Sequence, residues 1–230
     1  MRTLPLALLA VLMILLCPGC SGDERFLKNL AKTDIDFVAD SHLREMNRAM
    51  KTLLVKLYNR NPRELQKSPA ASSDQRLLQI FASPGALRFA ELDNRQGTAA
   101  LELAFNADFP GDRVFAVMVG LVSMVRSSYN WQEEQFMLDT LDPQILFDCA
   151  RNIEILAWRL SNHRDARGNL LFLTNSQPGE EVNLSFERLY GRMIAIQDLL
   201  AFTLAGRVDR GITRVFQGAV SSAAFLPMGL

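Results

Sequence analysis

The chain has 230 residues, in which 25 Lys and Arg balance 25 Asp and Glu, and 49% of its residues are hydrophobic. This length suits one domain that buries a substantial core. Because the charges balance, no basic surplus attracts the chain to nucleic acid, and no polybasic stretch indicates purely electrostatic binding to a membrane surface.

The first twenty residues have the pattern of an export signal. Arg2 supplies a positive start, and Leu4–Leu16 is an apolar run that only Pro5 interrupts. As a helix this run would be roughly 20 Å long, which is shorter than the ~30 Å hydrocarbon core of a bilayer. The run is therefore typical of a cleaved signal and not of a permanent membrane span.

The signal ends in Cys17-Pro18-Gly19-Cys20, which resembles the lipobox of bacterial lipoproteins. Gly19 and Cys20 match its last two positions, whereas Cys17 and Pro18 depart from its usual residues. The resemblance covers about a tenth of the chain and implies diacylglycerol and N-acyl groups on Cys20. Ser21 stands where an aspartate would imply retention in the inner membrane, so the resemblance implies the periplasmic leaflet of the outer membrane. An ordinary cleaved signal, or an uncleaved anchor, is the alternative.

These features divide the chain into three parts. Residues 1–19 are the signal peptide that is removed, residues 20–32 are the lipidated cysteine with a short tether, and residues 33–230 form a single helical domain. After processing, Cys149 is the one unmodified thiol, so no disulfide is expected and stability must come from packing.

The domain begins with a long predicted helix. Thr33 and Asp36 resemble a capping box, and an apolar stripe at spacings of three and four predicts a helix to about Asn59. The stripe consists of Ile35, Val38, His42, Met46, Ala49, Leu53 and Leu57. Asn61-Pro62 then indicates a stop and a restart, and further helices are expected at 72–81 and 98–105, while 86–93 is compatible with helix or irregular structure.

A run that is apolar on every side follows. Val114–Val125 lies between Arg113 and Arg126 and would be roughly 18 Å long as a helix, too short to cross a membrane. Such a helix is typical of a protein interior, so we expect a buried central helix at about 112–128 with the others packed around it. A buried strand is the alternative, because the run is rich in valine.

Four more helices are expected after the central one, at 131–139, 143–162, 185–207 and 209–225. Their buried stripes are Ile145, Leu146, Cys149, Ile153, Leu156, Ala157 and Leu160 in the second, and Phe186, Leu189, Met193, Ile196, Leu200 and Leu204 in the third. Residues 170–174 and 181–184 are compatible with one small β-hairpin. The sequence therefore predicts an all-α fold, a compact bundle of about seven helices.

Few residues have the spacing of a chemical site. His42 and Glu45 are three apart on a helix, which can point both at one metal ion, with Asp36 and Asp40 nearby. However, His42 also belongs to the apolar stripe, which favours a histidine packed in the core.

Other chemical groups have plainer structural explanations. His163, Arg164 and Asp165 follow a helix end, where a cationic group meets exposed carbonyl oxygens favourably. Cys149 belongs to a buried stripe, which favours an inert thiol over a nucleophile.

The segment after the central helix holds acidic and aromatic side chains. Glu133 and Glu134 are adjacent and therefore diverge on a helix, which is typical of a solvated face. Tyr129, Trp131 and Phe136 are compatible with an aromatic contact patch and with core packing.

The sequence contains no G-x-S-x-G, no H-E-x-x-H and no glycine-rich phosphate loop, so we predict no catalytic, cofactor-binding or metal-binding residue. The mature chain resembles uncharacterised proteobacterial envelope lipoproteins in its general character. We expect a non-catalytic adaptor or accessory subunit that binds the bilayer through Cys20 and associates with an envelope protein. A carrier of a lipid or small apolar ligand is the alternative, since nine Met and fourteen Phe could line a pocket. An enzyme would require His42 or His163 to meet carboxylates in an open cleft.

Overall fold

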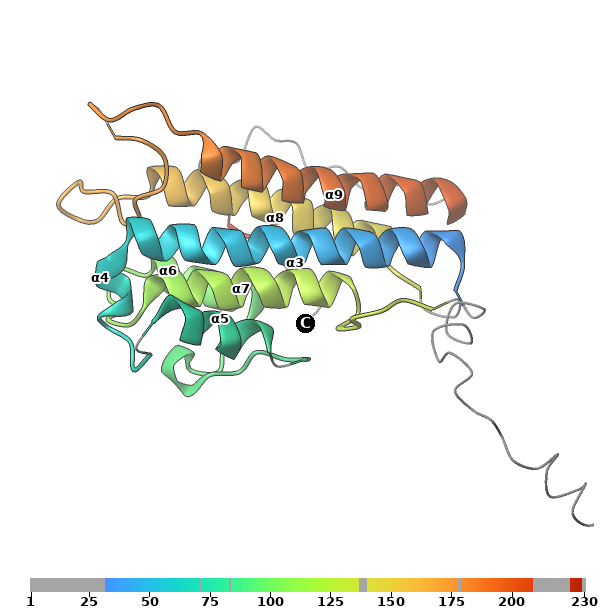
Figure 1. The fold of residues 1–230 in the computed structure, drawn as a ribbon, viewed down its shortest axis with the longest axis horizontal. Helices are drawn as coiled ribbons and strands as arrows, with labels where there is room; N and C mark the ends of the chain where they lie inside the picture. Colours follow the sequence, from blue (N-terminus) through green and yellow to red (C-terminus); the bar gives the residue numbers. More distant parts are fainter. Residues whose placement is uncertain are drawn as a thin grey trace, which may run out of the picture.

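A computed structural model describes residues 32–70, 72–82, 84–136, 140–177, 179–208 and 224–228. Within these ranges the chain forms seven α-helices, one short 3-10 helix and no strand, which confirms the predicted all-α fold (Figure 1). The elements are α3 (Asp34–Arg60), α4 (Pro62–Leu65), α5 (Ser73–Phe81), η1 (Ala90–Leu92), α6 (Gly97–Phe105), α7 (Arg113–Ser128), α8 (Pro143–Asn162) and α9 (Ser185–Val208). The signal, Cys20 and most of the tether lie outside the described residues.

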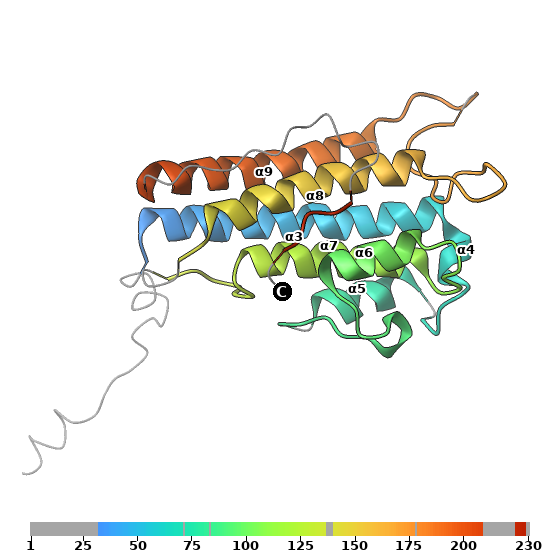
Figure 2. The same cartoon turned by 180° about the vertical axis from the view of Figure 1, so that it is seen from behind.

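The predicted central helix is α7, and its burial is confirmed. Every side chain from Val114 to Val125 is buried, and of the whole helix only Arg126 reaches partly to the surface. The α7 helix contacts α3, α4, α5, α6 and α8. The long helices run side by side, with α3 between α9 and α7 in Figure 1 and α8 and α6 on the opposite face in Figure 2. None of the described helices is long and apolar enough to cross a membrane.

Helices α6 and α7 approach each other most closely at two glycines. A Cβ atom on Gly120 would lie 2.7 Å from the Leu101 side chain and 2.9 Å from the carbonyl oxygen of Gly97. Ser123 of α7 also caps α6, because the Gly97 N–H donates to the Ser123 hydroxyl at 2.6 Å. The two helices therefore form a unit that tolerates no extra atom at their contact.

Helix α3 begins with the predicted capping box, in which Thr33 and Asp36 bond each other's backbone and side-chain groups. Its predicted stripe is confirmed from Met46 onward but is wrong in the first turns. Val38 is 41% exposed, whereas Ala39 and Asp40 are buried. The buried face is rotated there because Asp40 binds the N–H of Gln135, a distant partner that the sequence pattern does not reveal.

The helix predicted at 131–139 is wrong over its described part, 131–136, which is irregular. Helix α7 ends at Ser128, and Asn130 and Trp131 both have left-handed backbone angles, with φ of 55° and 60°. Two consecutive residues in this conformation turn the chain away from the helix axis. Of the helix predicted at 209–225, residues 209–223 lie outside the described part, and 224–225 are not helical.

The small hairpin considered at 170–184 does not form in the described residues of that segment. Their one ladder-type contact is an isolated bridge between Arg164 and Leu170. Leu173 does not pair with a second strand, because its N–H donates to the side-chain oxygen of Asn61 at 2.8 Å. A helix side chain thus takes the hydrogen bond that a hairpin would have used.

Candidate functional site

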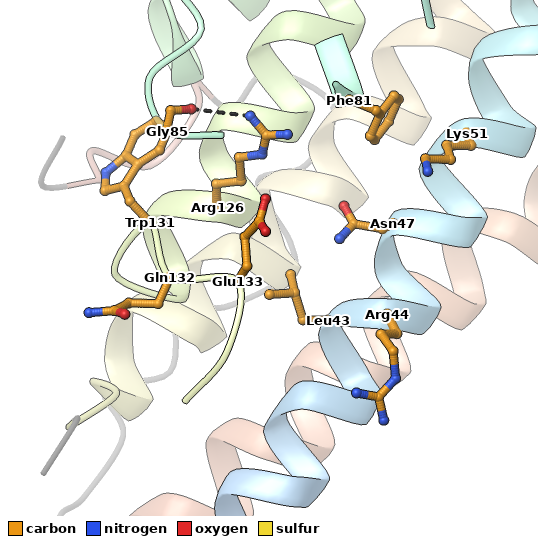
Figure 3. Close-up of a pocket in the computed structure, with 10 residues that line it drawn as sticks. All are labelled: Leu43, Arg44, Asn47, Lys51, Phe81, Gly85, Arg126, Trp131, Gln132 and Glu133. Atoms are coloured by element: carbon orange, nitrogen blue, oxygen red, sulfur yellow. Dashed lines mark hydrogen bonds between the residues drawn. The ribbon is translucent and has the colours of Figure 1, made fainter. Parts of the chain in front are cut away.

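A cavity of about 240 Å³ opens between the middle of α3 and the segment that follows α7 (Figure 3). Six of its ten lining residues are polar or charged, and three of these are cationic. We call it the α3–loop groove. It is lined by Leu43, Arg44, Asn47, Lys51, Phe81, Gly85, Arg126, Trp131, Gln132 and Glu133.

One wall of the groove is the surface of α3. Arg44, Asn47 and Lys51 follow one another at spacings of three and four, so a helix presents them on one side. The buried Leu43 belongs to the same wall and joins it to the core. In Figure 3 the Asn47 amide and the Lys51 ammonium point toward the space between the two walls, and the ammonium lies 5.3 Å from the centre of the Phe81 ring.

The opposite wall is irregular and strained. The Trp131 N–H donates to the carbonyl oxygen of Arg126 at 2.8 Å, which closes the turn after α7. Left-handed angles at a residue other than glycine cost about 1–3 kcal/mol and persist only where the surroundings enforce them. The turn at Asn130 and Trp131 brings Trp131, Gln132 and Glu133 to the groove (Figure 3).

Arg126 fixes the end of the groove nearest α5. Its guanidinium donates to the carbonyl oxygens of Gly85 and Ile80, each at 3.1 Å. Burial lowers the pKa of Arg126, and the nearby Glu133 carboxylate opposes that shift. Arg126 thus ties α7 to α5 while contributing positive charge to the groove.

The segment after α7 is held in place by contacts with Asp40 and Lys32. The backbone N–H of Gln135 donates to Asp40 at 2.8 Å, and Lys32 forms an ion pair with the same carboxylate. Lys32 also lies 3.5 Å from Glu134 and 5.0 Å from the centre of the Phe136 ring. Burial disfavours the charge on Lys32, but the two carboxylates raise its pKa overall. The loop of the groove is therefore in contact with Lys32, the last residue of the tether.

The groove has a surplus of positive charge. Glu133 is the one carboxylate in its lining, against Arg44, Lys51 and Arg126. In the part of the chain that the structure describes, neither Arg44 nor Lys51 forms an ion pair, and Arg44 donates to the Ser41 hydroxyl. The side-chain oxygen of Asn47 is shielded from solvent and has no hydrogen-bond partner there. The cations thus suit the groove to an anionic group, whereas the Asn47 oxygen is sealed from a ligand in the groove.

The carboxylates considered for a metal site are occupied elsewhere. Glu45 pairs with Arg48, Asp40 with Lys32, and Asp36 accepts from the N–H of Thr33. His42 is half-buried, and burial lowers its pKa. Across the described ranges, no three His, Cys, Asp or Glu side chains are grouped so that they could hold a metal ion.

His163 is the residue that ends α8, and its N–H donates to the carbonyl oxygen of Arg159 at 2.8 Å. Its ring packs edge-on against Phe105, with centroids 5.4 Å apart, instead of meeting the helix-end carbonyls. Burial, followed by Arg159 and Arg113, lowers the pKa of His163. The neighbouring Asp165 accepts hydrogen bonds from its own turn. These contacts are structural.

Cys149 lies in the core as predicted. It is completely buried, and burial raises the pKa of its thiol to about 12. The Gln197 amide donates to its sulfur at 3.3 Å. Tyr129 is also fully buried, whereas Trp131 lines the groove and Phe136 meets Lys32.

A second group of charged side chains lies beneath α5, where Arg76 and Asp112 are buried and Glu91 reaches the surface. Arg76 forms two hydrogen bonds of 2.6 Å with Glu91 and stacks on the Phe115 ring at 3.6 Å. Its Nε atom is 3.4 Å from Asp112, which accepts a hydrogen bond of 2.7 Å from the Tyr58 hydroxyl. Because Arg76, Glu91, Asp112 and Tyr58 are engaged with one another, we interpret them as structural.

Sequence reasoning missed the residues that form the groove. The spacing of Arg44, Asn47 and Lys51 was a usable signal for one polar face of α3. No pattern indicated that Arg126 and Trp131 would face them, because the turn after α7 was predicted as helix. Comparisons with protein-family models, with curated proteins and with solved structures gave no match.

Proposed function

We propose that this protein is a membrane-tethered, non-catalytic adaptor that binds another envelope protein in the α3–loop groove. The observation that carries the proposal is the open groove itself, with an aromatic lining and two cations, Arg44 and Lys51, that form no ion pair with a described carboxylate. Soluble domains keep few such surfaces without a binding role, and concave sites with convergent polar groups are typical of recognition.

The tether is the second part of the proposal. Gly19 and Cys20 supply the acceptor for lipid attachment, and acyl chains bury at ~0.8 kcal/mol per CH₂, which makes anchoring by several chains stable. Lys32, twelve residues after Cys20, contacts the loop of the groove through Glu134 and Phe136. An extended segment of that length reaches at most ~40 Å, so the groove would work close to the lipid surface. We place the anchor in the periplasmic leaflet of the outer membrane.

Three observations support an adaptor over the other candidate functions. His163 ends α8 at the opposite end of the bundle from the first turns of α3, which carry His42 (Figure 1). The α6–α7 contact is so close at Gly120 that it leaves no room for an apolar ligand there. Most residues that line the described groove are polar or charged, which suits a protein segment better than a lipid chain.

The anchor is tested by Cys20→Ser. We expect the variant to lose palmitate labelling and to accumulate as an unprocessed precursor, while the wild type fractionates with the outer membrane. Mass spectrometry of the wild-type N-terminus should identify acylated Cys20. A wild-type protein that is free in the periplasm would refute the tether.

The adaptor role is tested by a photo-crosslinking amino acid at Gln132, an exposed residue of the groove, in intact cells. The control position is Arg167, in the exposed turn after α8. We expect a discrete crosslinked partner from position 132 that is absent from position 167 and absent when Lys51 is replaced by Gln. Equal products from both positions would contradict an adaptor that uses the groove.

A further inference from the structure

The exposed side of α9 loses its charges toward the end of the helix. The first turns present Glu187, Arg188 and Arg192 to solvent. From Ala195 to Gly206, by contrast, no exposed residue is charged, because the one charged residue of this stretch, Asp198, is half-buried and forms an ion pair with α8. The exposed residues of the stretch are Ala195, Leu199, Phe202, Thr203 and Gly206.

These exposed residues lie on one side of the helix, since they recur at spacings of three and four. Leu199 is 60% exposed and Phe202 44%, so this side presents apolar surface. Val38 of α3, which is 41% exposed, borders it, because Glu45, two turns farther along the same row of α3, lies 3.9 Å from Arg192 of α9. We call this surface the α9 face: Val38, Ala195, Leu199, Phe202, Thr203 and Gly206.

The α9 face lies at the end of the bundle where the tether joins the domain. Helices α3 and α9 are antiparallel, because Lys56, near the end of α3, bonds Ser185 at the start of α9 (Figure 1). The first turns of α3 are therefore beside the last turns of α9. Lys32, two residues before α3, is twelve residues after Cys20, and a flexible chain of that length spans roughly 20 Å.

We infer that the α9 face rests on the phospholipid surface in which Cys20 is anchored. Leu199 and Phe202 enter the interfacial region, as the apolar side of an interfacial helix does, while the charged first turns of α9 stay in water. A bilayer that holds Cys20 is always within reach of this face, whereas a protein partner must first diffuse to it. The inference rests on the proposed tether and goes beyond it, because a second contact fixes the orientation of the domain.

This orientation leaves the α3–loop groove open to water. Glu45 and Lys56 mark the side of α3 that contacts α9. Arg44, Asn47 and Lys51 line the groove, and at about 100° per residue they lie on the opposite side of the same helix. A bundle that rests on its α9 face therefore presents the groove away from the lipid, where an envelope protein could reach it.

The test uses the full-length acylated protein in vesicles of phosphatidylethanolamine and phosphatidylglycerol, with an environment-sensitive fluorophore on one introduced cysteine. Acylation blocks Cys20 and Cys149 is completely buried, so only the introduced thiol reacts. The fluorophore is attached after Leu199→Cys or, as the matched control, after Leu78→Cys, because Leu78 of α5 is 61% exposed. We expect brominated phospholipid to quench the label at position 199, and aqueous iodide to quench the label at position 78.

A second pair of variants tests whether the apolar side chain makes the contact. Here the fluorophore is attached after Thr203→Cys, at an exposed residue of the α9 face. Leu199→Glu places a charge on the face and should move the label into water, so that iodide quenching replaces most of the lipid quenching. Leu78→Glu makes the same change on α5 and should leave the label at position 203 unaffected. A label attached after Gln132→Cys, in the groove, should be quenched by iodide and not by lipid.

Equal lipid quenching at positions 199 and 78 would overturn the inference, as would a label at position 199 that iodide reaches and lipid does not. A label at position 199 that neither quencher reaches would mean that protein covers the α9 face, either residues 209–223 or a second copy, and would overturn it too. Mass spectrometry of Cys20 in the same samples separates the contact from the tether. Acylated protein whose label stays in water removes this inference alone, whereas unacylated protein refutes the tether and this inference with it.

Discussion

At the scale of single residues, Arg76 is a buried charge whose pairing matters for stability. Its guanidinium is completely buried and is shared by Glu91 and Asp112, which come from different elements. Removing one partner from a buried ion pair leaves an uncompensated charge and typically costs about 3–5 kcal/mol. The pairing is therefore important for stability although it has no role in the groove.

We expect Arg76→Met, which keeps a long side chain over Phe115, to lower the free energy of unfolding by about 3–5 kcal/mol at neutral pH. Urea unfolding measures this directly. Arg95→Met is the control, because Arg95 is exposed and lies 3.9 Å from an exposed Asp93. Its effect should stay within about 0.5 kcal/mol.

The penalty of Arg76→Met should shrink on acidification. Burial raises the pKa of Asp112, and Arg76 is one of the groups that lower it, so the variant's Asp112 has a still higher pKa. An acid with a higher pKa in the folded state binds its proton more tightly there, and ionising it destabilises the fold as pH rises. Lowering the pH from about 7 to about 5 should therefore reduce the difference in free energy of unfolding between variant and wild type. The reduction is at most about 1.4 kcal/mol for each unit by which the Asp112 pKa of the folded variant exceeds that of the folded wild type. A constant gap would show that Asp112 does not carry the cost.

At the scale of elements, the α6–α7 pair depends on the missing side chain of Gly120. A Cβ there would meet the backbone oxygen of Gly97 at 2.9 Å, and backbone cannot move as a flexible side chain can. We expect Gly120→Ala to destabilise the protein by about 1–3 kcal/mol, because it forces the two helices apart.

Gly191→Ala provides the matched comparison for that prediction. Gly191 lies in α9, is exposed, and an added Cβ there would meet nothing within 4 Å. Alanine should raise stability by up to about 1 kcal/mol through helix propensity. Thermal melts of both variants should therefore move in opposite directions, and a shared direction would contradict the packing argument.

The segment 131–136 is the element on which the groove depends, and Asp40 holds it in place. Asp40→Ala removes the acceptor of the Gln135 N–H and the partner of Lys32, so we expect hydrogen exchange at Gln135 to become about tenfold faster or more. Asp40→Asn keeps an acceptor oxygen but loses the charge and should have an intermediate effect. Asp34→Ala, at an exposed carboxylate in the first turn of the same helix, should leave this exchange rate unchanged.

The sequence predicted those elements whose cause is local. The capping box at Thr33, the restart at Pro62 and the burial of Val114–Val125 depend on spacing and composition alone, and all are confirmed. The segment 131–136 has helical composition, yet Asp40 and Lys32, distant in sequence, determine its path. The groove was missed for the same reason. The helical spacing of Arg44, Asn47 and Lys51 predicts its α3 wall, but no local pattern predicts the opposite wall.

At the scale of the whole molecule, the described part of the C-terminal segment closes the bundle. Residues 224–228 cross the face that carries α8 and α6 (Figure 2), where Phe225 and Met228 are buried and Arg159 lies 4.5 Å from the centre of the Phe225 ring. Asn152 holds this segment through Leu226, as Asn61 holds the loop at Leu173. The bundle is therefore stabilised by irregular segments as well as by its helices.

We expect Asn152→Ala to lower the free energy of unfolding by about 1–3 kcal/mol, because both backbone groups of Leu226 lose their partner in a poorly solvated site. Removing residues 224–230 should cost at least as much, since it also exposes the core beneath Phe225 and Met228. If Asn152 stabilises the protein through its hydrogen bonds to Leu226, the effects of the two changes on the free energy of unfolding are not additive. Asn152→Ala should then cost much less in the shortened chain than in the full one. Asn162→Ala, whose amide is exposed and bonds only the carbonyl of Trp158 in the described structure, should be nearly neutral in both chains. Urea unfolding of the four combinations measures the coupling, and full additivity would mean that Asn152 stabilises α8 by some route other than the C-terminal segment.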